Sequence, residues 1–320
     1  MNNMKLRVCL TDKCNFLCEY CREGGEAGFN SENQMDSDKL VVLLEELNKC
    51  GFEALRFTGG EPLLRKDWYE IVKKVSDKKI FKKITMVTNG SMILRNDNAR
   101  KIADAGFKSV TVSLDSIDKC IFSDITHYSC YEDVIKGILK LKEYGVNVKI
   151  NSVISKRNID KVFELIDFCA DNKMNIKLLD LVGMDSDYWK KEYVSFDGIE
   201  DKLRKNADEI FTQYQDEGFG TPEHVYNYKG IEVVVKNSNQ GTCYIESCKK
   251  CKKFPCQSGI VSMILSHDGL LKVCSLNDSD YVDVKPLVEN DLTIKKQIGE
   301  IINAYNSAQF YDGEWNSKCS

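Results

Sequence analysis

Six β-strand patterns alternate with helical patterns between residues 5 and 182, and this alternation limits the possible folds more than any other feature. The predicted strands lie at 5–11, 53–58, 82–88, 108–114, 146–154 and 175–182. The predicted helices between them lie at 36–51, 66–78, 97–105, 131–145 and 159–172. Regular alternation gives parallel strands with right-handed crossovers. Because six units fall short of the eight in a closed barrel, the pattern predicts an α/β fold with a partial (β/α)6 TIM-like barrel.

The alternation stops after residue 182, and a different organisation follows. Residues 184–215 look like a connector and an amphipathic helix, and 230–237 look like a strand. A cysteine-rich run then leads into a hairpin whose turn is Asp268-Gly269, and a last helix spans roughly 291–307. We therefore expect three parts, a barrel at 1–182, a connector with a helix at 183–240 and a C-terminal subdomain at 241–320.

Fourteen cysteines in 320 residues indicate metal binding more than disulfide bonding. The N-terminus "MNNMKLRVCL" has no apolar run of signal-peptide length, and no segment reaches the length of a membrane span. We therefore expect a cytoplasmic protein with no membrane partner, in which a reducing environment keeps the thiols free. The net charge of −4 argues against a general nucleic-acid binder, which usually carries a basic surplus.

Three of the cysteines, Cys14, Cys18 and Cys21, follow the first predicted strand at the spacing C-x3-C-x2-C. Closely spaced thiolates bind soft metals and iron–sulfur clusters. Three ligands on one loop can hold three corners of a [4Fe–4S] cube and leave the fourth iron open to another ligand. The alternative is a three-thiolate zinc site completed by a distant residue. Six scattered cysteines are expected to be inert thiols, namely Cys9, Cys50, Cys120, Cys130, Cys169 and Cys319.

Three further motifs occupy the ends of the next three strands. "GGEP" follows the second strand, "TNGS" the third and "DS" the fourth. Because the carboxyl ends of parallel strands meet at one face of a barrel, these motifs and the three-cysteine loop are expected to share one mouth. Gly59 and Gly60 allow a turn in which the backbone comes close to a ligand.

The whole of residues 5–182 resembles the radical S-adenosylmethionine (SAM) superfamily. The resemblance rests on "CNFLCEYC", "RFTGGEPLL", "MVTNGS", "VTVSLDS" and "VKINSVI". It implies that the amino and carboxylate groups of SAM chelate the open iron. It also implies that one electron from the cluster cleaves SAM, and that the resulting 5′-deoxyadenosyl radical abstracts hydrogen from a substrate.

The resemblance also assigns roles to residues of the mouth. It implies that the GGEP edge meets the ammonium of SAM, with Glu61 supporting that ammonium, and that Phe16 or Tyr20 covers the cluster or the adenine. The cofactor-binding residues that it implies are Gly59, Gly60, Glu61, Pro62, Thr88, Asn89, Ser113, Asn151 and Tyr20.

Within the superfamily, the chain most closely resembles the GTP cyclase of molybdenum-cofactor biosynthesis over nearly its full length. That family has a second [4Fe–4S] cluster, held by three C-terminal cysteines, whose open iron meets the substrate. The candidate ligands here are Cys248, Cys251, Cys256 and Cys274, with Cys243 nearby. Four ligands would make the cluster an electron relay, three would leave an open iron, and zinc is the structural alternative.

The chain departs from the cyclase pattern at positions that bear on the substrate. "QSGIVSMIL" has no arginine where the cyclase has Asn-Arg-x-Arg, and Ala54 stands where the cyclase usually has lysine. Arg7, Lys149 and Lys177 remain as candidate substrate-binding residues. Because a triphosphate needs several cations or backbone donors, these departures argue against GTP cyclisation.

The expected function is therefore that of a radical SAM enzyme with an auxiliary [4Fe–4S] cluster in the C-terminal subdomain. The expected substrate is a ribosomally made peptide or a small metabolite, and the expected reductant is a flavodoxin or a ferredoxin. The alternatives are GTP cyclisation, an iron–sulfur electron carrier and a zinc-stabilised binding module.

Overall fold

The computed structural model describes residues 4–21, 33–182, 187–216, 219–254, 256–276, 281–289 and 291–311. All structural statements below refer to these residues. Of the cysteines named above, Cys319 lies outside them.

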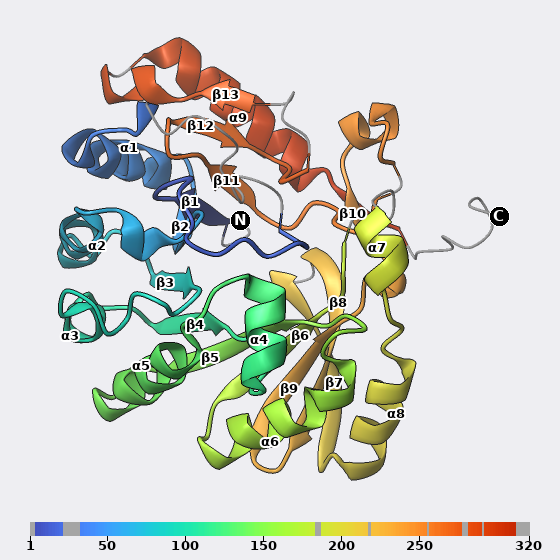
Figure 1. Cartoon of the computed structure of the whole chain (residues 1–320). Coiled ribbons are helices and arrows are strands. Elements are labelled where there is room, and N and C mark those ends of the chain that lie inside the picture. The colour runs from blue at the N-terminus through green and yellow to red at the C-terminus, as the bar shows by residue number, and fades with distance from the viewer. Residues whose placement is uncertain are drawn as a thin grey trace.

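One curved sheet of twelve strands forms the frame of the molecule, in the order β13-β12-β11-β1-β2-β3-β4-β5-β6-β9-β8-β7. The strands β1 to β6 follow one another in parallel, and β9 extends the parallel series beyond β6. Figure 1 shows this sheet curving around an interior without closing. The partial barrel predicted from the alternation is confirmed. The strands of this sheet are β1 (Met4–Cys9), β2 (Phe52–Thr58), β3 (Lys83–Thr88), β4 (Ser109–Ser113), β5 (Val148–Val153), β6 (Asn175–Leu179), β7 (Glu209–Asp216), β8 (Phe219–Tyr228), β9 (Ile231–Lys236), β11 (Met263–Leu265), β12 (Leu270–Lys272) and β13 (Tyr281–Asp283).

Helices cover the outer face of the sheet, as Figure 1 shows for α1, α2, α3 and α5. They are α1 (Ser37–Lys49), α2 (Trp68–Asp77), α3 (Asn98–Asp104), α4 (Lys119–Thr126), α5 (Tyr131–Glu143), α6 (Val162–Asp171), α7 (Asp187–Glu192), α8 (Asp197–Asn206) and α9 (Leu292–Asn306). The helix α1 begins after Asp36, whose side chain accepts from the backbone N–H groups of Asp38 and Lys39. None of the described helices combines the length and hydropathy that crossing a bilayer requires.

Side chains alternate between the two faces of each barrel strand. In β1, Leu6 and Val8 are fully buried under the outer helices, whereas Arg7 between them is half-buried on the opposite face. In β2, Leu55 and Phe57 likewise pack outward. The inner face, which we call the lumen, therefore carries polar and charged side chains, while the apolar core lies between sheet and helices.

The prediction for residues 184–215 was partly wrong. Helices form at α7 and α8, and the C-cap of α8, Ala207, already has extended backbone. The next residues form β7, which pairs antiparallel with β8 and forms an edge of the sheet. The segment "EIFTQY" is rich in residues that favour strands, and pairing with β8 satisfies its backbone. The helix α4 and the strand β8 were also not predicted.

The C-terminal residues extend the same sheet from its other side. The hairpin predicted around Asp268-Gly269 is confirmed as β11 and β12, and β11 pairs in parallel with β1. A separate two-stranded sheet joins β10 (Thr242–Tyr244) to β14 (Gln309–Tyr311). Because one sheet runs through all three predicted parts, the boundaries at 182 and 240 stay predictions.

Candidate functional site

The turn after β2 is joined directly to the backbone that leads into the three-cysteine loop. The Gly60 N–H donates to the carbonyl oxygen of Thr11 at 2.8 Å, and the Glu61 N–H donates to that of Lys13 at 2.7 Å. A Cβ atom at Gly60 would lie 2.3 Å from the Lys13 carbonyl oxygen, and one at Gly59 would lie 2.4 Å from the Thr11 carbonyl oxygen. Close backbone packing against residues 11–13 therefore requires glycine at both positions. This contact fixes the position of the backbone that leads into Cys14.

Glu61 connects the same turn to the end of β3. Its carboxylate accepts hydrogen bonds from the Leu63 N–H at 3.0 Å, the Thr88 hydroxyl at 2.7 Å and the Asn89 N–H at 2.6 Å. The side chain is completely buried, and this burial raises its pKa to about 7. Pro62 begins the short 3₁₀ helix that follows, η2 (Pro62–Leu64). Glu61 therefore fixes the TNGS turn relative to GGEP.

Asn89 extends this network to the first cysteine. Its side-chain amide lies 3.8 Å from Cys14 Sγ as a donor and donates to Asn15 Oδ1 at 3.0 Å. Asn15 in turn donates to the Ser91 hydroxyl at 2.9 Å. The Phe16 backbone N–H also donates to Cys14 Sγ, at 3.4 Å. Donors directed at a sulfur are the kind of outer contact that tunes a cluster-bound thiolate.

The three thiols lie where a cluster could be reached from outside. Cys14 and Cys21 are exposed and Cys18 is half-buried. Burial, with the negative charge of Asp115 as the next cause, raises the pKa of Cys18 to about 12. A bound metal would supply the positive charge that deprotonates such thiols. The Phe16 ring is buried and packs edge-on against Phe122 of α4, at 5.9 Å between ring centroids.

The ends of β4 and β5 form the opposite wall of the mouth. Ser113 and Asn151 are half-buried neighbours in register on these strands. Tyr20 of the cysteine loop donates to the buried Asp115 carboxylate at 2.6 Å, and Asp115 also accepts from the Val153 N–H at 2.8 Å. Asp115 therefore fastens the cysteine loop to this wall. It was not among the predicted residues, although it belongs to the "DS" motif that marked the end of the fourth strand.

The lumen below the mouth contains more cations than the sequence analysis identified. Arg7, Lys149 and Lys177 occupy inner-face positions, as do Arg56, Lys236 and Lys272. Lys177 forms an ion pair with Glu223 of β8. Burial lowers the pKa of Lys177 to about 8, against the effect of Glu223. The missed cations follow the same alternation of faces, so strand periodicity could have found them.

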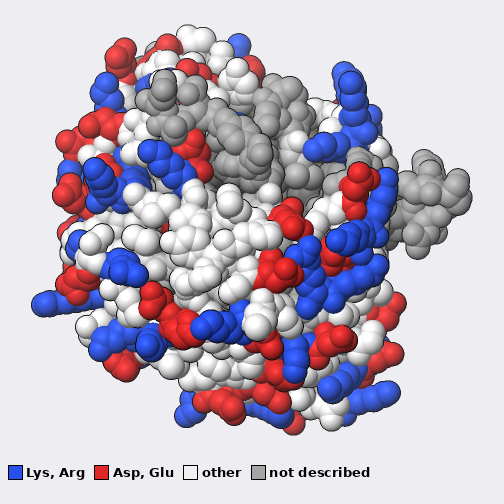
Figure 2. Space-filling view, in the orientation of Figure 1, with Lys and Arg blue, Asp and Glu red and all other residues white. Residues whose placement is uncertain are grey.

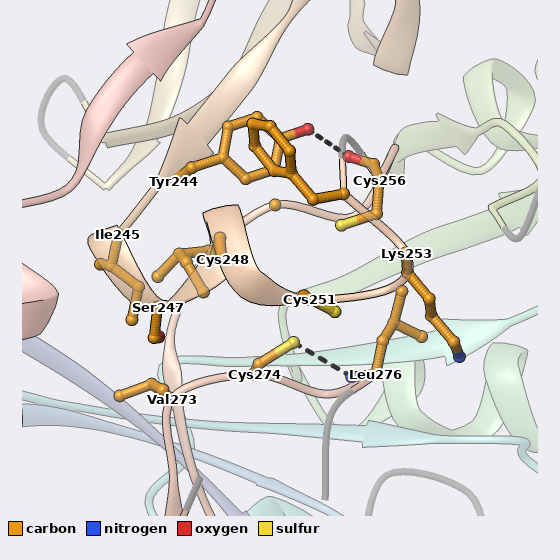
Figure 3. A pocket seen from close by; sticks show the side chains of 13 residues that line it. Tyr244, Ile245, Ser247, Cys248, Cys251, Lys253, Cys256, Val273, Cys274 and Leu276 are labelled. Carbon is orange, nitrogen blue, oxygen red and sulfur yellow. Dashed lines mark hydrogen bonds between the residues drawn. The ribbon is translucent and has the colours of Figure 1, made fainter. Parts of the chain in front are cut away.

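The four C-terminal cysteines line a single pocket. Figure 3 shows Cys248, Cys251, Cys256 and Cys274 around a common space, with the ring of Tyr244 above them. The Leu276 N–H donates to Cys274 Sγ at 3.3 Å, and the Tyr244 hydroxyl donates to the Cys256 carbonyl oxygen. Cys243 is not part of this pocket. It is buried, and its thiol donates to the Gly220 carbonyl oxygen at 3.7 Å.

The donor chemistry of both sites fits iron–sulfur clusters. Across the described ranges, no three His, Cys, Asp or Glu side chains converge tightly enough to hold one metal ion. Four thiolates around a single zinc would lie about 3.8 Å apart, because Zn–S bonds are about 2.3 Å and tetrahedral. A [4Fe–4S] cube instead takes one thiolate at each of its corners, and the four thiols that line the C-terminal pocket supply that donor set.

The sequence matches the Radical SAM superfamily family model over residues 8–169. Among curated proteins, it is 30% identical over 300 residues to the "Probable GTP 3′,8-cyclase" of Methanocaldococcus jannaschii, covering 93% of each chain. It is 29% identical over 307 residues to the protein of the same name from Sulfurisphaera tokodaii, covering 95% of this chain and 91% of that one.

The fold is also similar to solved structures at low sequence identity. Streptococcus suis SuiB bound to S-adenosylmethionine superposes with a TM-score of 0.63 and 16% identity, covering 93% of this chain and 68% of that chain. The protein anSMEcpe with bound AdoMet gives a TM-score of 0.59 and 14% identity, covering 92% and 82%. These likenesses concern the fold, whereas the family model and the curated relatives identify the family. The chain therefore belongs to the radical SAM superfamily, whose enzymes use a [4Fe–4S] cluster together with S-adenosylmethionine.

Proposed function

We propose that this radical SAM enzyme abstracts hydrogen from a peptide or a small metabolite held in the lumen, and that its auxiliary cluster serves as an electron relay. The observation that carries the proposal is the gathering of four thiols, Cys248, Cys251, Cys256 and Cys274, around one pocket. Four protein ligands would occupy every iron of a cube, so no iron would be left for a substrate.

The three-cysteine loop is the proposed site of the first cluster. With a cluster and SAM bound, the site supplies a 5′-deoxyadenosyl radical. Cys14, Cys18 and Cys21 would hold three irons, and Asn89 and the Phe16 N–H would donate to the Cys14 sulfur. The carboxylate of Glu61 accepts three hydrogen bonds, all from donors of the protein itself. Its proposed role is therefore to hold the GGEP and TNGS turns in place for SAM.

The remaining wall of the mouth is proposed to bind the rest of SAM. Ser113 and Asn151 are adjacent and half-buried at the strand ends, where polar groups can meet a ribose or a carboxylate. Thr88 already donates to Glu61, so its proposed contribution is to position that carboxylate. Tyr20, held by Asp115, would lie beside the cluster.

A substrate in the lumen would lie between the two cysteine sites. The lumen is lined by cations, which favours a substrate with an anionic group. A peptide is supported by the fold, because Streptococcus suis SuiB, solved "bound to precursor peptide SuiA", superposes with a TM-score of 0.64 over 93% of this chain. A small metabolite is supported by the curated relatives, which are named as probable GTP 3′,8-cyclases.

GTP cyclisation is the second candidate, and the names of relatives covering 93% of the chain favour it. The departures from the cyclase sequence pattern argue against it, and Lys177, one of the candidate substrate residues, is neutralised by Glu223. The fourth pocket cysteine also argues against an open iron for a purine. Incubation of the reduced enzyme with GTP and SAM, followed by mass spectrometry for a cyclised nucleotide, decides between the two candidates.

The main test uses cysteine variants of anaerobically reconstituted protein. Cys14→Ala should abolish cleavage of SAM to 5′-deoxyadenosine under dithionite, whereas the matched control Cys120→Ala, at an exposed thiol outside both sites, should not change it. Cys256→Ala should keep the auxiliary cluster but open one iron, so that added cyanide changes its electron paramagnetic resonance spectrum. SAM cleavage by Cys14→Ala, or a cyanide-silent Cys256→Ala cluster, would contradict these assignments.

Four exposed lysines in the segment that lines the auxiliary pocket form the proposed docking surface for the reductant. Lys249, Lys250, Lys252 and Lys253 are all exposed in the segment that carries the first three pocket cysteines. Figure 2 shows blue side chains gathered at the upper right, where Figure 1 places the segment after β10. Because the chain as a whole has a net charge of −4, this local basic surface suits an acidic electron carrier such as a flavodoxin or a ferredoxin.

A further inference from the structure

Lys236 is a buried cation that the proposed chemistry does not yet use. It ends β9 on the lumen side, opposite Leu179 of β6 and Glu223 of β8 in register. Only 9% of the residue is exposed. Among the described residues, Lys236 Nζ forms no hydrogen bond and no ion pair, and it is not one of the fully enclosed atoms without partners, so it stays accessible to a ligand. A buried ammonium without a bonded partner is costly, so its presence calls for a ligand.

Neither neighbouring acid binds the Lys236 ammonium, although Oδ1 of Asp180 has no hydrogen-bond partner of its own. Both oxygens of Glu223 have partners, because one pairs with Lys177 and the other accepts from Gln213 at 3.2 Å. Asp180, which follows β6, accepts from the Ser238 N–H at 2.8 Å and from the Ser238 hydroxyl through a single oxygen. Asp180 is close enough to act electrostatically on Lys236 but does not form an ion pair with it.

As the last residue of β9, which runs parallel to β6, Lys236 lies at the carboxyl end of the sheet, the edge that carries the three-cysteine mouth. Arg7 of β1 and Cys256 of the auxiliary pocket both act electrostatically on Lys236. Burial lowers the pKa of Lys236, and the positive charge of Arg7 adds to that effect. Lys236 thus faces a second cation across the lumen, with one carboxylate, Asp180, in the same neighbourhood. Glu223 also acts on Lys236 but is paired with Lys177, so this group holds three cations and two carboxylates, a surplus of one positive charge.

We propose that Lys236 binds one anionic group of the substrate, a carboxylate or a phosphate, in the lumen between the three-cysteine mouth and the four-cysteine pocket. This inference rests on the proposed function and narrows its substrate to a molecule with such a group. A local surplus of about one charge suits a single anionic group at Lys236. Lys236 would thereby set which end of the substrate faces the pocket.

The test is anion binding by the reconstituted enzyme with SAM bound, measured by isothermal titration calorimetry. The probes are inorganic phosphate, acetate and GTP, so that the phosphate and carboxylate sources give separate answers. Wild type should bind phosphate or acetate, and Lys236→Met should weaken that binding at least tenfold. Lys236→Arg should restore it, because it restores the charge. The matched control is Lys108→Met, at an exposed lysine outside the lumen, which should bind the probe within twofold of wild type.

Three results would overturn the inference. One is that neither phosphate nor acetate binds to the wild type, and another is that Lys236→Met binds them as tightly as wild type does. The third is that GTP binds a thousandfold more tightly than phosphate, because the site would then recognise a triphosphate. Replacing a buried unpaired ammonium by methionine should not unfold the protein. SAM cleavage by wild type, measured separately, reports whether the proposed function itself fails.

Discussion

Substitution of Gly60 by alanine tests whether the GGEP turn holds the three-cysteine loop. The added Cβ would lie 2.3 Å from the Lys13 carbonyl oxygen, 2.5 Å from its carbonyl carbon and 2.7 Å from the Asp12 carbonyl oxygen. All three are backbone atoms, so the two segments must separate. Separation would strain or break the two hydrogen bonds that join them, from the Gly60 and Glu61 N–H groups.

The cost can be worked out from these contacts. Overpacking costs about 1–3 kcal/mol, and each lost hydrogen bond costs about 0.5–1.5 kcal/mol. The sum is about 2–6 kcal/mol, localised at the entrance to Cys14. A loop destabilised by about 2 kcal/mol opens roughly 30 times more often. We therefore expect Gly60→Ala to lose the first cluster and to keep the auxiliary one.

The assay is iron content after anaerobic reconstitution and desalting. Two [4Fe–4S] clusters give about eight irons per chain, and Gly60→Ala should retain about four. The matched control is Gly198→Ala in α8, where an added Cβ meets no atom within 4 Å. It should retain full iron and unfold at or slightly above the wild-type temperature, because alanine favours helix. If Gly60→Ala kept about eight irons and cleaved SAM at the wild-type rate, the contact between the GGEP turn and residues 11–13 would not control the three-cysteine loop.

Three other predictions concern single features of the site. Asn89→Ala removes a donor to Cys14 Sγ and should lower the reduction potential of the first cluster, measured by redox titration; an unchanged potential would contradict this. The pKa of Lys177 is about 8 in the folded state and 10.5 in the unfolded state, so between these pH values only the unfolded state holds the proton. The free energy of unfolding of the wild type should therefore rise by up to about 3 kcal/mol, relative to that of Lys177→Met, from pH 8 to 10.5. Denaturant titrations of the two proteins at several pH values measure this difference. Equal pH profiles of the two proteins would refute this. The double charge reversal Lys252→Glu and Lys253→Glu should slow reduction by flavodoxin and remove its salt dependence, whereas reduction by dithionite should be less affected.

The sequence predicted the barrel well because the alternation of strands and helices is a local signal. Its strands and helices were placed close to their observed bounds, and the motif positions followed from strand order. The segment forming β7 and β8 was missed because edge strands depend on a partner. An isolated "EIFTQY" with charged neighbours can look like one face of a helix until β8 and β9 supply the pairing.

The candidate site was predictable in its residue types but not in its contacts. Spacing and strand ends identified the cysteines and the polar residues of the mouth. The position of the Glu61 carboxylate among three protein donors depends on how the turns after β2 and β3 meet. The pairing of Lys177 with Glu223 depends on β8, a strand that was not predicted. Long-range contacts of this kind are set by the whole fold, so motifs alone do not specify them.

The pairing of β11 with β1 has a consequence for how the chain can be divided. The family model covers residues 8–169, but β1 lies between β2 and β11, and β6 lies between β5 and β9. A fragment truncated at residue 182 would leave both β1 and β6 as open edges with unpaired backbone groups. Such edges recruit other strands, so we expect the fragment to aggregate. The part of the chain that carries the family signature is therefore not expected to fold on its own. The C-terminal strands protect the two edges of its sheet from pairing with other chains.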